Sequence, residues 1–187
     1  MNRFHRWYCR SALWKKLLSS QVIPWALKGV DLGTDVLEVG PGPGLTTDIL
    51  RQRLPHITSI EIDPRLAASL QERMRNTNVR VIQGDATAMP FPSDSFSAAV
   101  SFTMLHHVPS AALQDRLLAE VYRILKPGGM FAGTDSTWSR AFALIHLWDT
   151  MVVVDPDGFG GRLEAAGFTD VSIRIARGAF SFRARRP

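Results

Sequence analysis

Residues 36–44 read VLEVGPGPG, and this stretch decides the fold. Its apolar start predicts a short buried strand over Asp35–Val39. Its glycines then predict a tight turn that passes directly into a helix over Leu45–Arg53. A strand that ends in glycines and leads straight into a helix is typical of the first unit of an α/β sheet, where the main chain can approach a ligand.

Strand-like and helical stretches alternate along the rest of the chain. Such alternation with short connections predicts parallel strands joined by right-handed crossovers, with helices on both faces of the sheet. Near the C-terminus, Val171–Ile175 and Phe180–Phe182 alternate apolar with polar residues, which predicts an antiparallel hairpin. The other predicted strands are His56–Ile62, Val79–Ile82, Phe96–Phe102 and Met130–Thr134, and the other predicted helices are Arg65–Arg75, Ala111–Leu125 and Arg162–Ala166.

Length and composition exclude several classes of protein. The 187 residues fit a single domain, and 45% hydrophobic residues are enough for a sizeable core. Cys9 is the only cysteine, which excludes a disulfide scaffold and a cysteine-rich metal site. The sequence has no run of eighteen apolar residues, which a transmembrane segment would need, and its basic N-terminus lacks the apolar region of a signal peptide. We therefore expect a cytoplasmic protein.

The net charge of +5 is unevenly distributed. Every Asp and Glu lies between Asp31 and Asp170, whereas basic residues gather in Arg3–Lys16 and Arg174–Arg186. An acidic middle with basic ends does not resemble the basic groove of a nucleic-acid-binding protein. The charge pattern therefore disfavours a nucleic acid as partner.

The turn after the first strand is spaced Gly-x-Gly-x-Gly, unlike the Gly-x-Gly-x-x-Gly of dinucleotide-binding proteins. Pro41 and Pro43 also remove two amide donors, so the turn suits a ligand without phosphate. Glu61 ends the second strand, where a carboxylate can bind both hydroxyls of a ribose. Asp85 follows the third strand, where it can accept a hydrogen bond from an exocyclic amine. Acids at neighbouring strand ends predict one shared crevice.

The order VLEVGPGPG, SIEID, VIQGDATAMPFPSDSFSAAV, LHHV and EVYRILKPGGMF resembles the class I S-adenosylmethionine-dependent methyltransferases of the small-molecule type. The resemblance covers residues 33–135, and the ending AAGFTDV…FRARRP is similar to the terminal hairpin of that group. It implies a Rossmann-like fold and S-adenosylmethionine as methyl donor. It also implies cofactor contacts from the glycine turn, the second and third strand ends and the fourth strand: Glu38, Gly40, Pro41, Gly42, Gly44, Glu61, Ile62, Asp85, Ala86, Ser101 and Phe102.

Each group of residues has an implied role. The main chain around Glu38, Gly40 and Gly42 would hold the methionine part of the cofactor, and Glu61 would bind the ribose. Ile62 would pack on adenine, whose edge Asp85 and the Ala86 amide would read. Ser101 and Phe102 would approach the sulfonium.

The acceptor follows by elimination. Residues 101–104 read SFTM rather than the Asn/Asp-Pro-Pro-Tyr/Phe that suits methylation of a base amine, and Cys9 is remote as a nucleophile. No metal-binding carboxylate cluster follows the fourth strand, so we expect no metal. A small organic, aromatic or lipophilic acceptor remains. His106 and His107 are candidate catalytic bases, although paired histidines there also suit packing.

Two other functions stay open: a catalytically silent cofactor-binding partner protein, and a nicotinamide-dependent oxidoreductase. We expect residues 1–30 to form a lid, residues 33–135 to bind the cofactor and residues 136–187 to face the acceptor, through His146, Trp148 and Asp149 or as plain core. A helix over Arg3–Leu18 would carry its large apolar side chains in one stripe along its length. This helix would either close over the crevice or lie on an anionic membrane. The oligomeric state is not indicated. The stripe consists of Phe4, Trp7, Ser11, Trp14 and Leu18.

Overall fold

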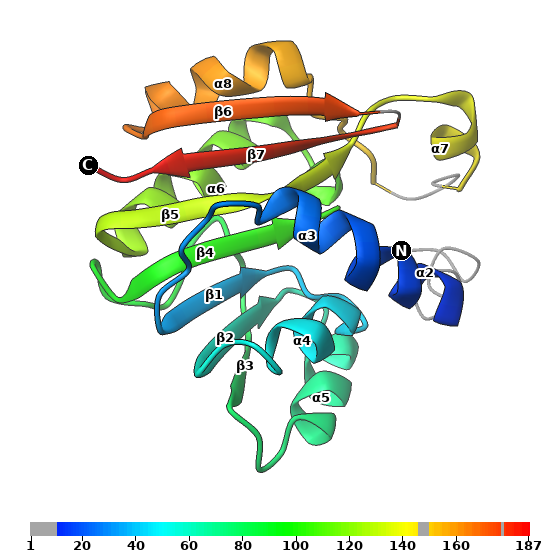
Figure 1. Ribbon diagram of the computed structural model, residues 1–187, viewed down its shortest axis with the longest axis vertical. Coiled ribbons are helices and arrows are strands. Elements are labelled where there is room, and N and C mark those ends of the chain that lie inside the picture. Colours follow the sequence, from blue (N-terminus) through cyan, green and yellow to red (C-terminus); the bar gives the residue numbers. More distant parts are fainter. Residues whose placement is uncertain (1–10, 146–149, 177) are drawn as a thin grey trace.

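The computed structural model describes residues 11–145, 150–176 and 178–187, and these contain one seven-stranded sheet (Figure 1). The strand order is β3-β2-β1-β4-β5-β7-β6. The first five strands pair in parallel, and β7 pairs antiparallel with both β5 and β6. This confirms the mostly parallel sheet and the C-terminal hairpin. The strands are β1 (Asp35–Val39), β2 (His56–Glu61), β3 (Val79–Gln83), β4 (Phe96–Phe102), β5 (Leu125–Ser136), β6 (Thr169–Ala176) and β7 (Ala179–Arg185).

Helices cover both faces of this sheet, as predicted. On one face, η1, α3 and α4 pack on strand residues such as Val36 and Val100. On the other face, α6 and α8 pack on the alternate strand residues, including Leu37 and Phe131. The helices are α2 (Ala12–Leu17), η1 (a π-helix, Leu18–Val22), α3 (Ile23–Ala26), α4 (Leu45–Leu50), α5 (Pro64–Arg73), η2 (a 3-10 helix, Leu105–His107), α6 (Ala111–Ile124), α7 (Arg140–Ile145) and α8 (Pro156–Ala165).

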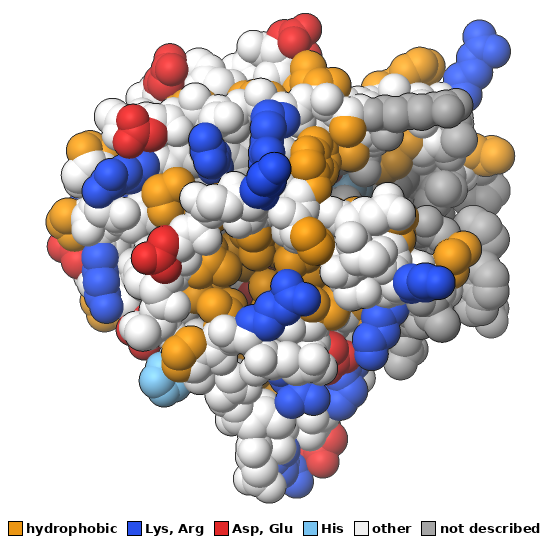
Figure 2. All heavy atoms as spheres, viewed as in Figure 1, with side chains coloured by type: hydrophobic (Ala, Val, Ile, Leu, Met, Phe, Trp, Pro, Cys, Tyr) orange, Lys and Arg blue, Asp and Glu red, His pale blue; other side chains and the backbone are white. Residues whose placement is uncertain are grey.

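The face that carries α3 and α4 is only partly covered. Figure 2 shows apolar side chains at the centre of this face, over β1 and β4, where the surface is hollowed. Beneath this hollow, β1 and β4 carry mainly apolar residues on both faces, and nearly all of their residues are buried.

Two boundaries differ from the sequence prediction by more than three residues. Helix α8 begins at Pro156, six residues before the predicted Arg162, because Asp155 caps it by accepting a hydrogen bond from the Asp157 N–H. The glycines between these positions hide the apolar period. Strand β5 begins at Leu125, which pairs with Phe96 before a bulge, and not at Met130.

The single N-terminal stripe is wrong at Ser11. Its backbone is extended (φ −72°, ψ 148°) and its hydroxyl accepts a hydrogen bond from the Trp14 N–H at 3.1 Å, so Ser11 caps a helix that begins at Ala12. Phe4 and Trp7 lie outside the described residues. The helical backbone continues past Leu18 through the π turn of η1 into α3. Pro24, which lacks an N–H, stands directly after that π turn.

Candidate active site

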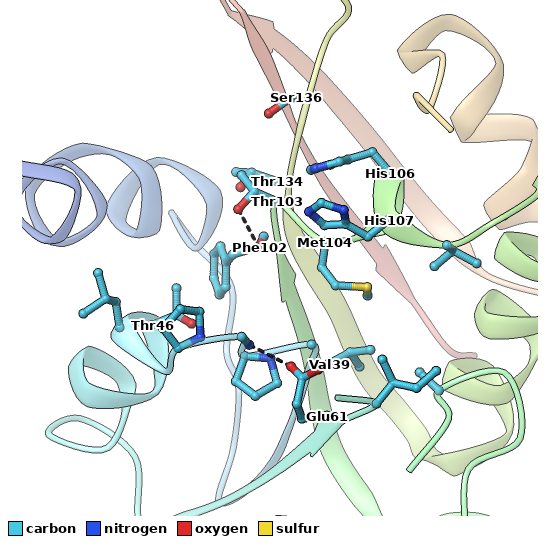
Figure 3. A pocket seen from close by; sticks show the side chains of 18 of the residues that line it. Val39, Thr46, Glu61, Phe102, Thr103, Met104, His106, His107, Thr134 and Ser136 are labelled. Carbon is cyan, nitrogen blue, oxygen red and sulfur yellow. Dashed lines mark hydrogen bonds between the residues drawn. The ribbon is translucent and has the colours of Figure 1, made fainter. Parts of the chain in front are cut away.

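A cavity of about 970 Å³ opens at the carboxyl ends of β1, β2 and β4. The chain order reverses between β1 and β4, and ligands of open α/β sheets bind at such a switch point. Figure 3 shows Glu61 at one end of the cavity and His106 and His107 at the other. We call the part formed by residues 40–43, 61–63 and 85–87 the β1–β3 side. We call the opposite part the β4–β7 side, and its described wall residues are Phe102, Thr103, Met104, His106, His107, Thr134, Ser136, Ala176, Gly178 and Ala179.

The glycine turn needs glycine at its two ends. Gly40 has a φ of +66°, and a Cβ there would lie 2.1 Å from the Met104 Cγ. Gly44 has a φ of +83° and would place a Cβ 2.4 Å from the Leu70 Cδ1. A side chain at either position would be strained in its backbone and would displace a neighbour.

All amides of residues 40–44, which the structure describes in full, are already used. The Gly40 N–H donates to the Ile60 carbonyl, the Gly42 N–H to Glu61 Oε2 and the Gly44 N–H to the Pro41 carbonyl, each at 2.9 Å. Pro41 and Pro43 have no N–H. This turn therefore offers no main-chain donor to a phosphate, in contrast to a dinucleotide-binding loop.

Glu61 lies on the cavity wall with 5% of its surface exposed. Its Oε1 accepts from the Asp63 N–H and its Oε2 from the Gly42 N–H, both at 2.9 Å. Burial raises the pKa of this carboxyl above its ordinary value, although the two N–H donors act in the opposite direction. Each oxygen keeps a lone pair for a ligand hydroxyl, because a carboxylate has about four acceptor sites.

Three further predicted residues share this wall. Ile62 is 64% exposed beside Glu61, which suits stacking on a flat ring. Asp85 is exposed and accepts a hydrogen bond from the Thr87 N–H at 2.8 Å, and Ala86 lies between them. The structure thus brings Gly40, Gly42, Glu61 and the residues after β3 to one wall, together with Pro41.

Glu38 lies behind the wall. Its carboxylate is 1% exposed and accepts hydrogen bonds from three hydroxyls, those of Thr46, Thr47 (2.6 Å) and Ser59 (2.8 Å). Burial raises the pKa of Glu38, and the three donors partly offset this. Glu38 therefore fixes the start of α4 and strand β2 around the glycine turn.

Gly44 and Ser101 also lie off the wall. Gly44 is the N-cap of α4, below the turn. Ser101 is fully buried and has no hydrogen-bond partner among the described residues, and only its neighbour Phe102 reaches the cavity. In a strand, successive side chains point to opposite faces, so the two could not both contact one ligand.

The structure distinguishes the two histidines. His106 is buried, and its Nδ1 lies 2.5 Å from Asp135 Oδ1, while its main-chain N–H donates to Asp135 Oδ2 at 3.1 Å. His107 is half-buried, and its Nδ1 lies 3.2 Å from the Thr150 carbonyl. Both line the cavity. The sequence prediction missed Asp135, although it is an acid on the strand after β4 and near the same sheet edge as Glu61.

Thr103 was also missed. It ends β4 with a φ of +51°, a conformation that is strained for a β-branched residue. Its N–H donates to the Thr134 carbonyl and its hydroxyl to the Phe102 carbonyl, both at 2.8 Å. This turn lays Met104 over Gly40 and brings His106 to Asp135. Strained residues of this kind cluster at active sites, but no sequence pattern reveals them.

Two other segments complete the described wall. Trp14, Leu18 and Trp25 line it from the N-terminal segment, which we define as residues 12–26. Phe142 and Thr150 line it from residues 136–160. His146, Trp148 and Asp149, which we expected there, lie outside the described residues.

The described residues contain neither a metal-binding group nor a membrane-spanning helix. Among the residues that the structure describes, no group of His, Cys, Asp or Glu could hold a metal ion. In that same part of the chain, no helix combines the length and apolar character needed to cross a membrane.

Comparison with known sequences identifies relatives. Residues 37–133, just over half of the chain, match a family model described as a methyltransferase domain. A probable ribosomal RNA small subunit methyltransferase A of Methanothermobacter thermautotrophicus is 38% identical over 141 residues, 69% of this chain and 50% of that protein. A demethylmenaquinone methyltransferase of Tropheryma whipplei is 32% identical over 117 residues, 61% of this chain and 46% of that protein. The chain spans about half the length of the curated relatives it matches.

Solved structures share the fold. A protein of Pyrococcus horikoshii superimposes with a TM-score of 0.81 over 96% of this chain and 94% of that chain, at 15% sequence identity. At that identity the likeness shows the fold, whereas the family-model match over residues 37–133 shows the family. The chain belongs to the class I S-adenosylmethionine-dependent methyltransferases.

Proposed function

We propose that this protein transfers a methyl group from S-adenosylmethionine to a small organic acceptor. The observation that carries the proposal is one cavity with the Glu61 carboxylate at one end and the His106–Asp135 pair at the other. On this assignment the β1–β3 side binds the cofactor and the β4–β7 side binds the acceptor.

The residues of the β1–β3 side fit the cofactor. Glu61 would accept hydrogen bonds from the two ribose hydroxyls, and the backbone donors Gly42 and Asp63 hold its carboxylate in place. Ile62 would cover the adenine, whose edge Asp85 and Ala86 would read. The glycine turn, which has no free amide, would pack on the methionine part by close contact of its main chain.

The chemistry needs positioning and a proton acceptor. S-adenosylmethionine supplies an electrophilic methyl group, whose bond to sulfur breaks with the electron pair remaining on sulfur. The protein holds the acceptor in line with that bond, which lowers the barrier by removing the entropy of encounter. For an acceptor with an O–H group, His106 would take the proton at Nε2, and Asp135 beside Nδ1 would stabilise the resulting charge.

The kind of acceptor is not fixed by the family. The two relatives above are named for ribosomal RNA and for demethylmenaquinone. Residues 101–104 lack the pattern that suits a base amine, and the acidic middle of the chain disfavours RNA. We favour a small organic acceptor for these reasons.

Calorimetric titration with S-adenosylmethionine, S-adenosylhomocysteine and NAD tests the cofactor. We expect binding of the first two and none of NAD, because no turn amide is free for a pyrophosphate. Tight NAD binding would instead favour the oxidoreductase. Binding without transfer of a labelled methyl group to any small molecule or to ribosomal RNA would favour the catalytically silent partner.

We further propose that the N-terminal segment is a lid, because Trp14, Leu17 and Gln21 line the cavity. Removing residues 1–18 should raise the cofactor dissociation constant or abolish turnover, and Trp14→Ala should act in the same direction without removing the buried Leu18. Unchanged affinity and turnover in both variants, with loss of binding to anionic vesicles in the truncated one, would favour the membrane role.

A further inference from the structure

The two sides of the cavity differ in charge. Among the described wall residues, the carboxylates are those of Glu61, Asp63 and Asp85, all on the β1–β3 side, and no lysine or arginine lines the wall. The remaining described wall, toward β5, β7 and the N-terminal segment, carries no carboxylate either. Apart from Gln21, His106 and His107, its large side chains are apolar, and they include Trp14, Leu17, Val22, Trp25, Phe102 and Phe142.

One buried hydroxyl on this apolar side has no partner within the part of the chain that the structure describes. Thr134 lines the cavity and is 1% exposed, and its Oγ1 has no hydrogen-bond partner among the described residues. Figure 3 shows it next to Thr103 on the cavity wall. Buried hydroxyls almost always have a partner, because burying one without a hydrogen bond is unfavourable. A ligand that enters the cavity can supply it.

We propose that the β4–β7 side binds an uncharged, mainly apolar acceptor whose polar group hydrogen-bonds to the Thr134 hydroxyl. The proposal rests on the proposed function and narrows its substrate class. An anionic acceptor would meet no cation on the described wall and would face three carboxylates across the cavity. A cationic acceptor would lose its hydration, and the nearest carboxylate on its own side, Asp135, is fully buried behind the wall and already bonded to His106 and Ser136.

A screen in the presence of S-adenosylhomocysteine tests the class of acceptor. Aromatic compounds matched in size, one third neutral, one third anionic and one third cationic, are tested for binding by thermal shift and then by calorimetry. We expect the binders to be neutral, with 2-naphthol as a reference probe and 2-naphthoate as its charged counterpart. Binders that are mainly charged, an even spread over the three groups, or no binder at all would overturn the proposal.

Variants of Thr134 test the hydrogen bond on the neutral binders. Thr134→Val keeps the shape and removes the hydroxyl, so we expect about three- to tenfold weaker binding. Thr134→Ser should restore most of the affinity. The matched control is Ser181→Ala, because Ser181 pairs with Thr134 in register, is buried and also lacks a partner among the described residues, yet does not line the cavity.

Cofactor titration separates the two possible failures. If S-adenosylhomocysteine binds all variants equally but Thr134→Val binds the neutral compounds as well as wild type, or loses no more than Ser181→Ala, the inference about Thr134 is wrong and the proposed function stands. If S-adenosylhomocysteine does not bind the wild-type protein, the proposed function itself is wrong.

Discussion

The two sides of the cavity differ in how completely their polar groups are paired. On the β1–β3 side, Glu38 accepts from three hydroxyls, Glu61 accepts from two amides, and every amide of the glycine turn has an acceptor. On the β4–β7 side, Thr134 is a buried wall residue whose hydroxyl has no partner in the described residues. The proposed cofactor side is therefore preorganised, whereas the proposed acceptor side has a polar group for a ligand to complete.

Replacing His106 should have the largest effect, because it would act on the chemical step. We expect His106→Asn to lower turnover by about 10²–10⁴-fold, the usual contribution of a general base. Asn keeps a hydrogen-bond donor beside Asp135, so the buried carboxylate is not left unpaired. Turnover is measured with saturating acceptor, and cofactor affinity by calorimetry, which should change little.

The matched control is His56→Asn, because His56 is exposed at the start of β2, beside Asp35 and away from the cavity. We expect His107→Asn to lower turnover less than His106→Asn, since its Nδ1 faces the Thr150 carbonyl and not a carboxylate. Normal turnover in His106→Asn would show that catalysis depends on positioning alone.

Removing the carboxylate of Glu61 should affect the other side of the cavity. We expect Glu61→Ala to weaken S-adenosylmethionine binding by at least about tenfold, because two charge-assisted hydrogen bonds to the ribose are lost. Asp85→Ala is the comparison, and its effect should be smaller because Asp85 is exposed. An unchanged dissociation constant in a folded Glu61→Ala protein would remove Glu61 from the site.

The fold could be predicted because each of its signals is local. The apolar runs of β1 and β4 and the glycine turn are continuous in sequence, and these two strands have the predicted bounds. At two places where the prediction was wrong, a cap outweighed the apolar period: Ser11 caps a helix in the middle of the expected stripe, and Asp155 caps α8, whose first turns contain glycines. Periodicity alone does not register such hydrogen bonds.

The site could be predicted only where its residues follow strand ends. Glu61 is the last residue of β2 and Asp85 lies two residues after β3, so strand order alone brings them together. The positions of Asp135, Thr103 and Thr134 depend on the backbone turn after β4 and on the face of β5 to which each side chain points. Neither feature can be predicted from the sequence. The acceptor side was therefore the less predictable part of the cavity.

The pH dependence of cofactor binding sharpens the contrast between the sides. Burial raises the folded-state pKa of Glu61 above its ordinary value of 4.5, so the carboxyl takes up a proton at a higher pH than a free one. The ribose hydroxyls need the ionised form, and affinity should fall as pH falls through that raised pKa, by up to about tenfold per pH unit. Calorimetry from neutral to acid pH measures this, and Glu61→Gln should show a flatter profile.

The free energy of unfolding of the unliganded protein should change with pH in the opposite direction from cofactor affinity, so it should fall as pH rises. A carboxyl whose folded-state pKa is raised destabilises the fold as pH rises from its unfolded value through the folded one. Glu38 and Glu61 both contribute in this direction, so Glu61→Gln should remove part of a loss of stability with rising pH. If wild type and Glu61→Gln instead show the same pH dependence of cofactor affinity, a group other than Glu61 titrates.

The smallest effect should come from the contact between β6 and the N-terminal segment, which we propose to be a lid. The Arg174 guanidinium on β6 donates to the Trp25 carbonyl at 2.6 Å, at the end of the N-terminal segment. Arg174→Met keeps an apolar side chain of similar length and removes the donor. Because the segment is also held by buried Leu18, Ile23 and Ala26, we expect it to loosen without detaching.

We therefore expect Arg174→Met to raise the Michaelis constant for the acceptor about two- to fivefold, in line with the loss of one hydrogen bond to a charged group that is partly offset by water. The dissociation constant of S-adenosylmethionine should change less than twofold. Among the described residues, no hydrogen bond joins Arg174 to residues 40–44 or to Glu61. Arg185→Met, an exposed position on neighbouring β7, is the control. If Arg174→Met weakens the binding of cofactor and of acceptor equally, the N-terminal segment acts on both sides of the cavity. The contrast between a preorganised side and a side completed by the ligand would then not extend to this segment.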